Sequence, residues 1–154
     1  NDPNIWLPYN IGKIRTAGTD ICFSARYSIR ELTAEGSVRY SFQDSQIRTP
    51  GSTDFGNAAP YTARHTFIIS GKAIYRGWGL EGIWHMREGR TDSNGALPGW
   101  NTLDFILYKK FDIKDICSII LSLDAKNVTD FRYEISRGYP MPGRALFGSF
   151  AISF

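Results

Sequence analysis

The sequence predicts an all-β fold of about seven antiparallel, up-and-down strands. Alternation of apolar and polar residues with a period of two dominates the 154 residues, and no segment shows the 3.6-residue stripe of an amphipathic helix. The connections between the alternating segments are by turns very short and long. Aromatic residues are abundant, with eight Tyr, ten Phe and four Trp, which favours strands and membrane interfaces.

The first hairpin has the clearest alternation in the chain. Thr19–Ile29 and Leu32–Gln43 flank the two residues Arg30-Glu31. A two-residue turn at that point places Arg26 opposite Glu35 on the polar face and pairs apolar side chains on the other face. Since each cross-strand pair is chemically compatible, we expect this register.

A second hairpin follows the same logic. Thr66–Tyr75 turns at Arg76-Gly77 into Trp78–Arg87. Its register places Lys72 opposite Glu81, again an opposite-charge pair on the polar face. We expect both ion pairs to fix the register of their hairpins, and each contributes less than about 1 kcal/mol beside water.

A third hairpin joins Thr102–Phe111 to Ile116–Lys126. With the turn at Asp112–Lys114, the expected pairs are Leu103 with Leu123, Phe105 with Leu121, and Leu107 with Ile119. A shift of two residues would set Asp104 against Asp124, and the repulsion between these carboxylates disfavours it.

Arg144–Phe154 forms the seventh predicted strand, and a weaker strand or extended segment is expected within Ile5–Thr16. In Arg144–Phe154, alternate residues are apolar or small: Leu146, Gly148, Phe150, Ile152 and Phe154. Soluble domains seldom end on such a strand. The last strand of an outer-membrane barrel must face lipid and close the wall, so we expect this strand to have that role.

Charge is confined to one face of the predicted sheet. The charged or titratable residues of that face are Asp20, Arg26, Glu35, Arg39, Lys72, Glu81, His85, Arg87, Asp104, Asp124 and Lys126. The other face carries almost none, except Lys109. Alternation alone fits a soluble barrel with an apolar interior as well as a membrane barrel with a polar lumen.

Strand length, aromatic placement and loop length favour the membrane barrel. The alternating segments are about 9–11 residues long, which suits a tilted membrane crossing. Aromatic residues lie near both strand ends: Tyr27, Tyr75, Trp78 and Phe111 by the short turns, and Tyr40 and Phe42 towards the long loops. The long connections Asp44–Arg64, Glu88–Asn101 and Asn127–Gly143 all fall at one end, typical of extracellular loops opposite periplasmic turns.

Bulk properties exclude several other classes. The net charge of +3 is spread without a basic stripe, so no nucleic-acid partner is expected. Cys22 and Cys117 lack the spacing of a metal site and are expected to be inert. No apolar run approaches the length of a transmembrane helix, and the chain opens without a signal peptide, so we expect an internal fragment.

Four segments resemble the C-terminal part of TonB-dependent outer-membrane receptors. They are Asn10–Lys13 with Gly18–Asp20, Pro60–His65, Ala125–Tyr133, and Gly138–Arg144. The specific part is Asn-Val-Thr-Asp…Tyr followed by Gly-Tyr-Pro-Met-Pro-Gly-Arg, which is similar to the signatures before the last strand of such receptors. The resemblance covers essentially the whole chain, and its ending looks closest to cobalamin-, haem- and siderophore-type receptors.

The resemblance implies the C-terminal portion of a transmembrane β-barrel of about 22 strands that is plugged by a separate N-terminal domain. Residues 1–154 would be a single barrel segment without the plug. The implied function is import of a scarce ligand (siderophore-iron, haem or cobalamin) across the outer membrane of a Gram-negative bacterium. Expected partners are outer-membrane lipid, the remaining strands and plug of the same receptor or a partner chain, TonB through the plug, and a small-molecule or metal-chelate ligand.

Ligand contacts are expected from the long loops and the upper lumen. The candidates are Arg87, Arg90, Asp92, Trp100, Arg132, Tyr133, Glu134 and Tyr139. Basic and aromatic groups suit an anionic or planar ligand. The alternative function, a soluble β-barrel that holds a small hydrophobic molecule, remains open on the residues alone.

No catalytic, metal or cofactor residues are assigned, and no enzymatic activity is expected. His85 is interpreted as a lumen side chain, and His65, near the outer rim, as an axial haem ligand only if a haem receptor is involved. Asp92–Gly95 reads as a hairpin turn rather than a calcium loop, since Asn-Gly favours such turns. Asn127-Val-Thr129 fits a glycosylation sequon but reads more simply as turn chemistry at a strand end.

Overall fold

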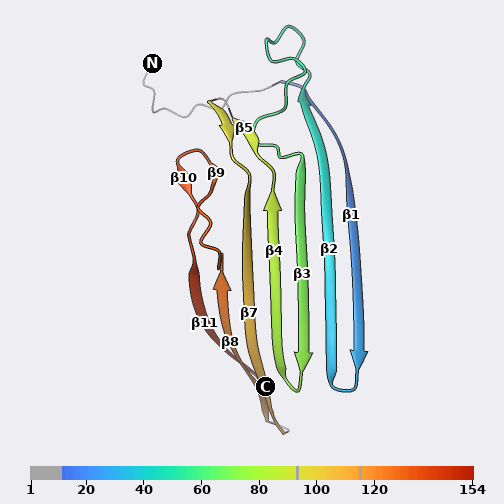
Figure 1. The fold of residues 1–154 in the computed structure, drawn as a ribbon, viewed down its shortest axis with the longest axis vertical. Coiled ribbons are helices and arrows are strands. Elements are labelled where there is room, and N and C mark those ends of the chain that lie inside the picture. The colour runs from blue at the N-terminus through green and yellow to red at the C-terminus, as the bar shows by residue number, and fades with distance from the viewer. Residues whose placement is uncertain (1–11, 93, 115) are drawn as a thin grey trace.

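The computed structural model describes residues 12–92, 94–114 and 116–154. Seven strands form one antiparallel sheet in the order β1-β2-β3-β4-β7-β8-β11 (Figure 1). They are β1 (Ile14–Ile29), β2 (Leu32–Ile47), β3 (His65–Tyr75), β4 (Trp78–Arg87), β7 (Trp100–Ile113), β8 (Cys117–Lys126) and β11 (Ala145–Ser153). Two small hairpins lie in the long connections, formed by β5 (Arg90–Asp92) with β6 (Gly95–Leu97) and by β9 (Glu134–Ser136) with β10 (Tyr139–Pro140). The predicted all-β, up-and-down fold is confirmed.

The first two hairpins have the predicted registers. Arg26 lies opposite Glu35, with 3.3 Å between Nε and Oε1. Lys72 lies opposite Glu81, at 4.0 Å between Nζ and Oε2. Since Glu35 is also opposite Lys72, charges alternate in one row across β1 to β4. The turns fit because Arg30, Arg76 and Gly77 adopt positive φ, as tight hairpin turns require.

The predicted register of the third hairpin is wrong. Leu107 lies opposite Leu123 rather than Ile119, a shift of four residues (123 − 119 = 4), and Phe105 lies opposite Ala125. The strand β7 continues through Asp112 to Ile113, so the turn expected at Asp112–Lys114 comes later.

Electrostatics and hydrogen bonding explain that shift. Lys126 now reaches Asp104, with 3.2 Å between Nζ and Oδ2. At the other end of the hairpin the Ser118 hydroxyl donates to Asp112 over 2.7 Å. An even shift keeps every side chain on its own face, so the predicted face assignment survives the register error.

Several strands extend beyond their predicted ends. Ile14–Thr16, placed in a separate weak strand, are the first residues of β1, and β2 continues to Ile47. The rest of the predicted weak strand, residues 5–11, falls outside the described residues. Asp92 pairs with Gly95 where β5 is followed by β6, which agrees with the hairpin predicted at Asp92–Gly95.

The sheet is a single layer whose apolar face is open. Apolar side chains on it remain largely exposed, as at Phe23 (68%) and Phe150 (62%). Within the described part of the chain, the buried apolar residues Ile47, Ala59, Ala63 and Leu97 all lie at the long-loop end. The apolar face therefore needs a covering outside this sheet, because so much exposed apolar surface is costly in water.

The two ends of the sheet differ. The tight hairpin turns and the C-terminus lie at one end, and the long connections with β5, β9 and β10 lie at the other (Figure 1). Among the described residues, no helix has the length and apolarity to cross a membrane. Because the long connections share one end of the sheet, the candidate residues that they carry lie at that end.

Candidate functional site

Hydrogen bonds join the three long connections to one another at the end of the sheet opposite the tight turns, which we call the outer end. The Tyr61 amide donates to the Thr91 carbonyl over 2.7 Å, which joins the first connection to the β5–β6 hairpin. The Arg90 guanidinium donates through Nη2 to the carbonyls of Glu134, at 3.1 Å, and Ile135. These bonds join that hairpin to the third connection, so the loops form one connected unit.

An ion pair between Arg137 and Asp92 also links the third connection to the β5–β6 hairpin. Arg137 donates from Nε to Asp92 Oδ2 at 2.8 Å and from Nη2 to Asp92 Oδ1 at 3.2 Å. We call Arg90, Asp92 and Arg137 the outer clasp. The Asp92 side chain is only 1% exposed, and such a paired, two-point geometry is the strongest form of Arg–carboxylate contact.

The pKa values of the three outer-clasp residues are all shifted by their surroundings. The hydrogen bond from Arg137 holds the pKa of Asp92 below its usual value, and the same contact raises the pKa of Arg137. Burial, followed by the nearby charge of Arg87, lowers the pKa of Arg90. The clasp is therefore fully formed only when Asp92 is ionised.

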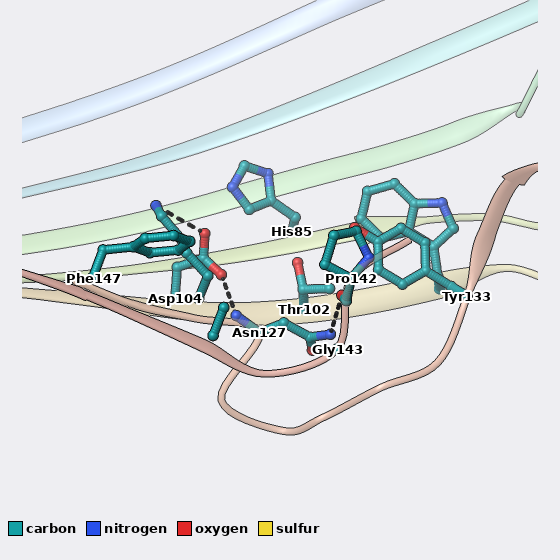
Figure 2. Close-up of a pocket in the computed structure, with 11 residues that line it drawn as sticks. His85, Thr102, Asp104, Asn127, Tyr133, Pro142, Gly143 and Phe147 are labelled. Carbon is teal, nitrogen blue, oxygen red and sulfur yellow. Dashed lines mark hydrogen bonds and ion pairs between the residues drawn. The ribbon is translucent and has the colours of Figure 1, made fainter. Parts of the chain in front are cut away.

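A depression of about 380 Å³ opens on the charged face below these loops (Figure 2). Its lining comes from β4, β7, β8, β11 and the third connection: His85, Trp100, Thr102, Asp104, Lys126, Asn127, Tyr133, Pro142, Gly143, Ala145 and Phe147. The rings of Trp100 and Tyr133 lie 4.6 Å apart. Burial, with the Asp104 charge second, raises the pKa of Tyr133, so this phenol stays neutral. We call this depression the lumen hollow.

A second hollow of about 560 Å³ lies between the first and third connections. It is lined by Tyr61, Ile135, Ser136, Tyr139 and Met141. Unlike the lumen hollow, it is built entirely by loop residues. We call it the loop hollow.

Asn127 folds the third connection over the lumen hollow. Its side chain donates to the Phe131 carbonyl (2.9 Å) and accepts from the Phe131 amide (3.1 Å). Its own amide donates to Asp104 Oδ1 on β7 (2.8 Å). Asp130 then accepts from the Arg144 amide (2.8 Å), just before β11. Turn chemistry, the simpler prediction for the Asn127 sequon, therefore matches the local geometry.

The predicted ligand residues lie in different parts of this end of the sheet. Trp100 and Tyr133 are brought together in the lumen hollow, while Tyr139 lines the loop hollow. Arg90 and Asp92 belong to the outer clasp, and Glu134 accepts from the Gly138 amide at 3.0 Å. Arg87 ends β4 with a buried Nε that lacks a partner among the described residues, and Arg132 is exposed.

Sequence reasoning missed Tyr61, Arg137 and Met141. Tyr61 lies within the Pro60–His65 segment, which carries part of the resemblance. No sequence pattern relates it to Met141, which lies 80 residues further along the chain (141 − 61 = 80). Arg137 could be found only from its partner, because a lone loop arginine has no periodic signature.

The two histidines have different surroundings. His65 Nδ1 lies 2.8 Å from the Tyr40 hydroxyl, and its Nε2 lies 4.0 Å from Glu88. His85 lines the lumen hollow (Figure 2). In residues 12–92, 94–114 and 116–154, no group of three or more His, Cys, Asp or Glu side chains is arranged to hold a metal ion.

These features define the wall of an outer-membrane-type β-barrel: an apolar outer face, a charged inner face, tight turns at one end and folded loops at the other. The chain belongs to the TonB-dependent receptor-like β-barrel family, whose model matches residues 1–128. No curated protein matches the chain. Members of this family are outer-membrane transporters rather than enzymes, and the family assignment gives no support to a soluble barrel around a hydrophobic molecule.

Proposed function

We propose that the chain forms part of the wall of a TonB-dependent transporter in the outer membrane of a Gram-negative bacterium. The family match over residues 1–128 is the observation that carries this proposal. The open apolar face supports it, since lipid would supply the missing cover.

The ligand proposed for this transporter is a scarce one: siderophore-iron, haem or cobalamin. The outer loops and the lumen hollow would meet it first, because loops on a rigid wall commonly carry recognition. Trp100, Tyr133 and Tyr139 offer aromatic surface, while Arg87 and Arg132 offer positive charge. Arg90, Asp92 and Glu134 would act mainly by holding the loops in place.

The remaining parts of the transporter come from outside residues 1–154. We propose that this segment contributes barrel strands only, and that further strands and the plug belong to the same receptor or to a partner chain. Within the described residues, β1 and β11 each pair with one neighbour in the sheet, so each offers an edge for such strands. TonB would be contacted through the plug.

The experiment is energy-dependent uptake. A strain lacking the gene, and the same strain complemented with it, would be given labelled ferric siderophores, haem and cobalamin one at a time. We expect complementation to restore uptake of one ligand, and expect loss of TonB to abolish that restored uptake. Restored uptake that persists without TonB, or no restored uptake of any of the three, would refute the proposal.

A further inference from the structure

The loop hollow is an apolar recess in an otherwise polar part of the molecule. Tyr61 comes from the first connection, and Ile135, Tyr139 and Met141 come from the third. Tyr139 is 65% exposed, so its ring is available for contact. The volume of the loop hollow, about 560 Å³, falls within the range of small-molecule sites, which are mostly apolar with a few polar groups.

Tyr61 is held in this hollow in an unusual backbone conformation. Its φ is +61°, in the left-handed region that residues with a large side chain rarely adopt. The bond from its amide to the Thr91 carbonyl keeps it there. Such conformations persist where the surroundings impose them, and they occur preferentially at functional sites.

A positive charge lies behind one wall of the hollow. The Arg90 guanidinium donates to the carbonyl of Ile135, which lines the hollow. Arg90 is 5% exposed, and its Nη1 has no hydrogen-bond partner among the described residues.

The nearby carboxylates do not cancel that charge. Asp92 is paired with Arg137, and the Glu134 carboxylate is hydrogen-bonded to the Gly138 amide. In the described part of the chain, the hydrogen bonds of Arg90 go to carbonyl oxygens, so its charge has no carboxylate partner there. Because Arg90 is buried, water screens its field poorly.

We propose that the loop hollow binds an aromatic ring that carries a negative charge, as part of a small molecule. Tyr61, Tyr139 and Met141 contact the ring, and Arg90 attracts the charge from behind Ile135. This proposal rests on the proposed function and names the chemical class of the ligand part that the outer loops recognise.

The test uses the receptor that contains this chain, in detergent micelles, and three small probes. Benzoate has both the ring and the charge, benzamide has the ring without the charge, and cyclohexanecarboxylate has the charge without the aromatic ring. Ligand-observed NMR titration measures each affinity. We expect benzoate to bind with a Kd on the order of 1 mM, from its few non-hydrogen atoms, and at least about fivefold more tightly than either other probe.

Variants locate the binding. Tyr139→Ala and Met141→Ala each remove part of the lining and should weaken benzoate binding by about fivefold or more. The control is Phe55→Ala, which removes another exposed aromatic side chain of the first connection, outside the hollow, and should leave binding unchanged. Arg90 is left intact because it also holds the third connection, so the probes rather than a mutation test the charge.

Equal binding of benzoate and benzamide would overturn the charge requirement, and unchanged benzoate binding in Tyr139→Ala and Met141→Ala would overturn the site. Uptake by cells is measured in parallel. If TonB-dependent uptake is intact while benzoate does not bind in the hollow, this inference fails and the transport proposal stands. If no ligand is imported at all, the transport proposal fails instead.

Discussion

Asn127 is the side chain on which the fold of the third connection most depends. It is 5% exposed and adopts a φ of +47°. Its side chain bonds both the amide and the carbonyl of Phe131, and more weakly the Pro142 carbonyl at 3.4 Å. We expect Asn127→Ala to open the connection locally without unfolding the sheet.

The magnitude follows from these contacts. Removing the side chain leaves two backbone groups of Phe131 without their partner, at about 1 kcal/mol each, because water can reach part of this connection. Alanine at positive φ adds about 1 kcal/mol. The local opening free energy should therefore fall by roughly 2–3 kcal/mol, which corresponds to roughly 30- to 150-fold more of the open state.

Limited trypsin digestion measures that opening, because Arg132 and Arg137 lie within the connection. Cleavage of a transiently open segment follows the open population when closing is fast. We expect the nicking rate at these arginines to rise by roughly 30- to 150-fold. Asn127→Gly is the matched variant: it loses the same hydrogen bonds but tolerates positive φ, so it should nick about fivefold more slowly than Asn127→Ala. A wild-type nicking rate in Asn127→Ala would refute the reasoning.

Three further predictions concern other parts of the wall. Gly143→Ala should lower the thermal midpoint in detergent by destabilising the entry to β11 by about 1–2 kcal/mol, since the new Cβ would lie 2.6 Å from Asp130 Oδ1. Gly148→Ala on the same strand, with nothing within 4 Å, should leave the midpoint unchanged. Leu121→Arg, at the middle of the apolar face of β8, should cost about 2–4 kcal/mol of folding free energy in lipid vesicles, and Ile120→Arg, on the lumen face, should cost clearly less. The pKa of Asp92 is lowered in the folded state, so the outer clasp stabilises above the unfolded pKa of about 4 and loses this contribution as the pH falls through the folded value. Hydrogen exchange of the β5–β6 hairpin, corrected for intrinsic rate, should then speed up on acidification in the wild type and be fast at every pH in Asp92→Asn.

The sheet could be predicted from sequence where its pairing depends on local information. The turns at Arg30 and Arg76 are tight, so the position of each turn determines the pairing within its hairpin, and the pairs Arg26–Glu35 and Lys72–Glu81 were predicted correctly. The pairing of Glu35 with Lys72, across the long first connection, was not predicted. The third hairpin has a longer connection, and period-two alternation is satisfied equally by registers four residues apart. The choice was made by Lys126 reaching Asp104 and by Ser118 reaching Asp112, contacts that alternation does not encode.

The site could be predicted only in part. The aromatic pair Trp100–Tyr133 was named as candidate ligand residues because loops of this kind carry recognition, and the structure brings the two rings together. The sequence did not predict the loop hollow, because Tyr61 and Met141 lie far apart in the chain and their connections are joined through Thr91 and Arg90 of the β5–β6 hairpin. Such long-range contacts between loops leave no periodic trace in a single sequence.

The polar residues of the motif that carries the resemblance hold the third connection together. In Asn127–Asp130 and Gly143–Arg144, the polar groups are used within the connection: Asn127 bonds Phe131, and Asp130 bonds the Arg144 amide. Gly143 leaves room for the Asp130 carboxylate, which a side chain there would displace from the Arg144 amide. Groups engaged in this way have little capacity left for a ligand, so the motif can identify the family while leaving the ligand undetermined. The side chains of Tyr61, Tyr139 and Met141 belong to the same segments but line the loop hollow instead, which is why the proposed ligand contact is placed on them.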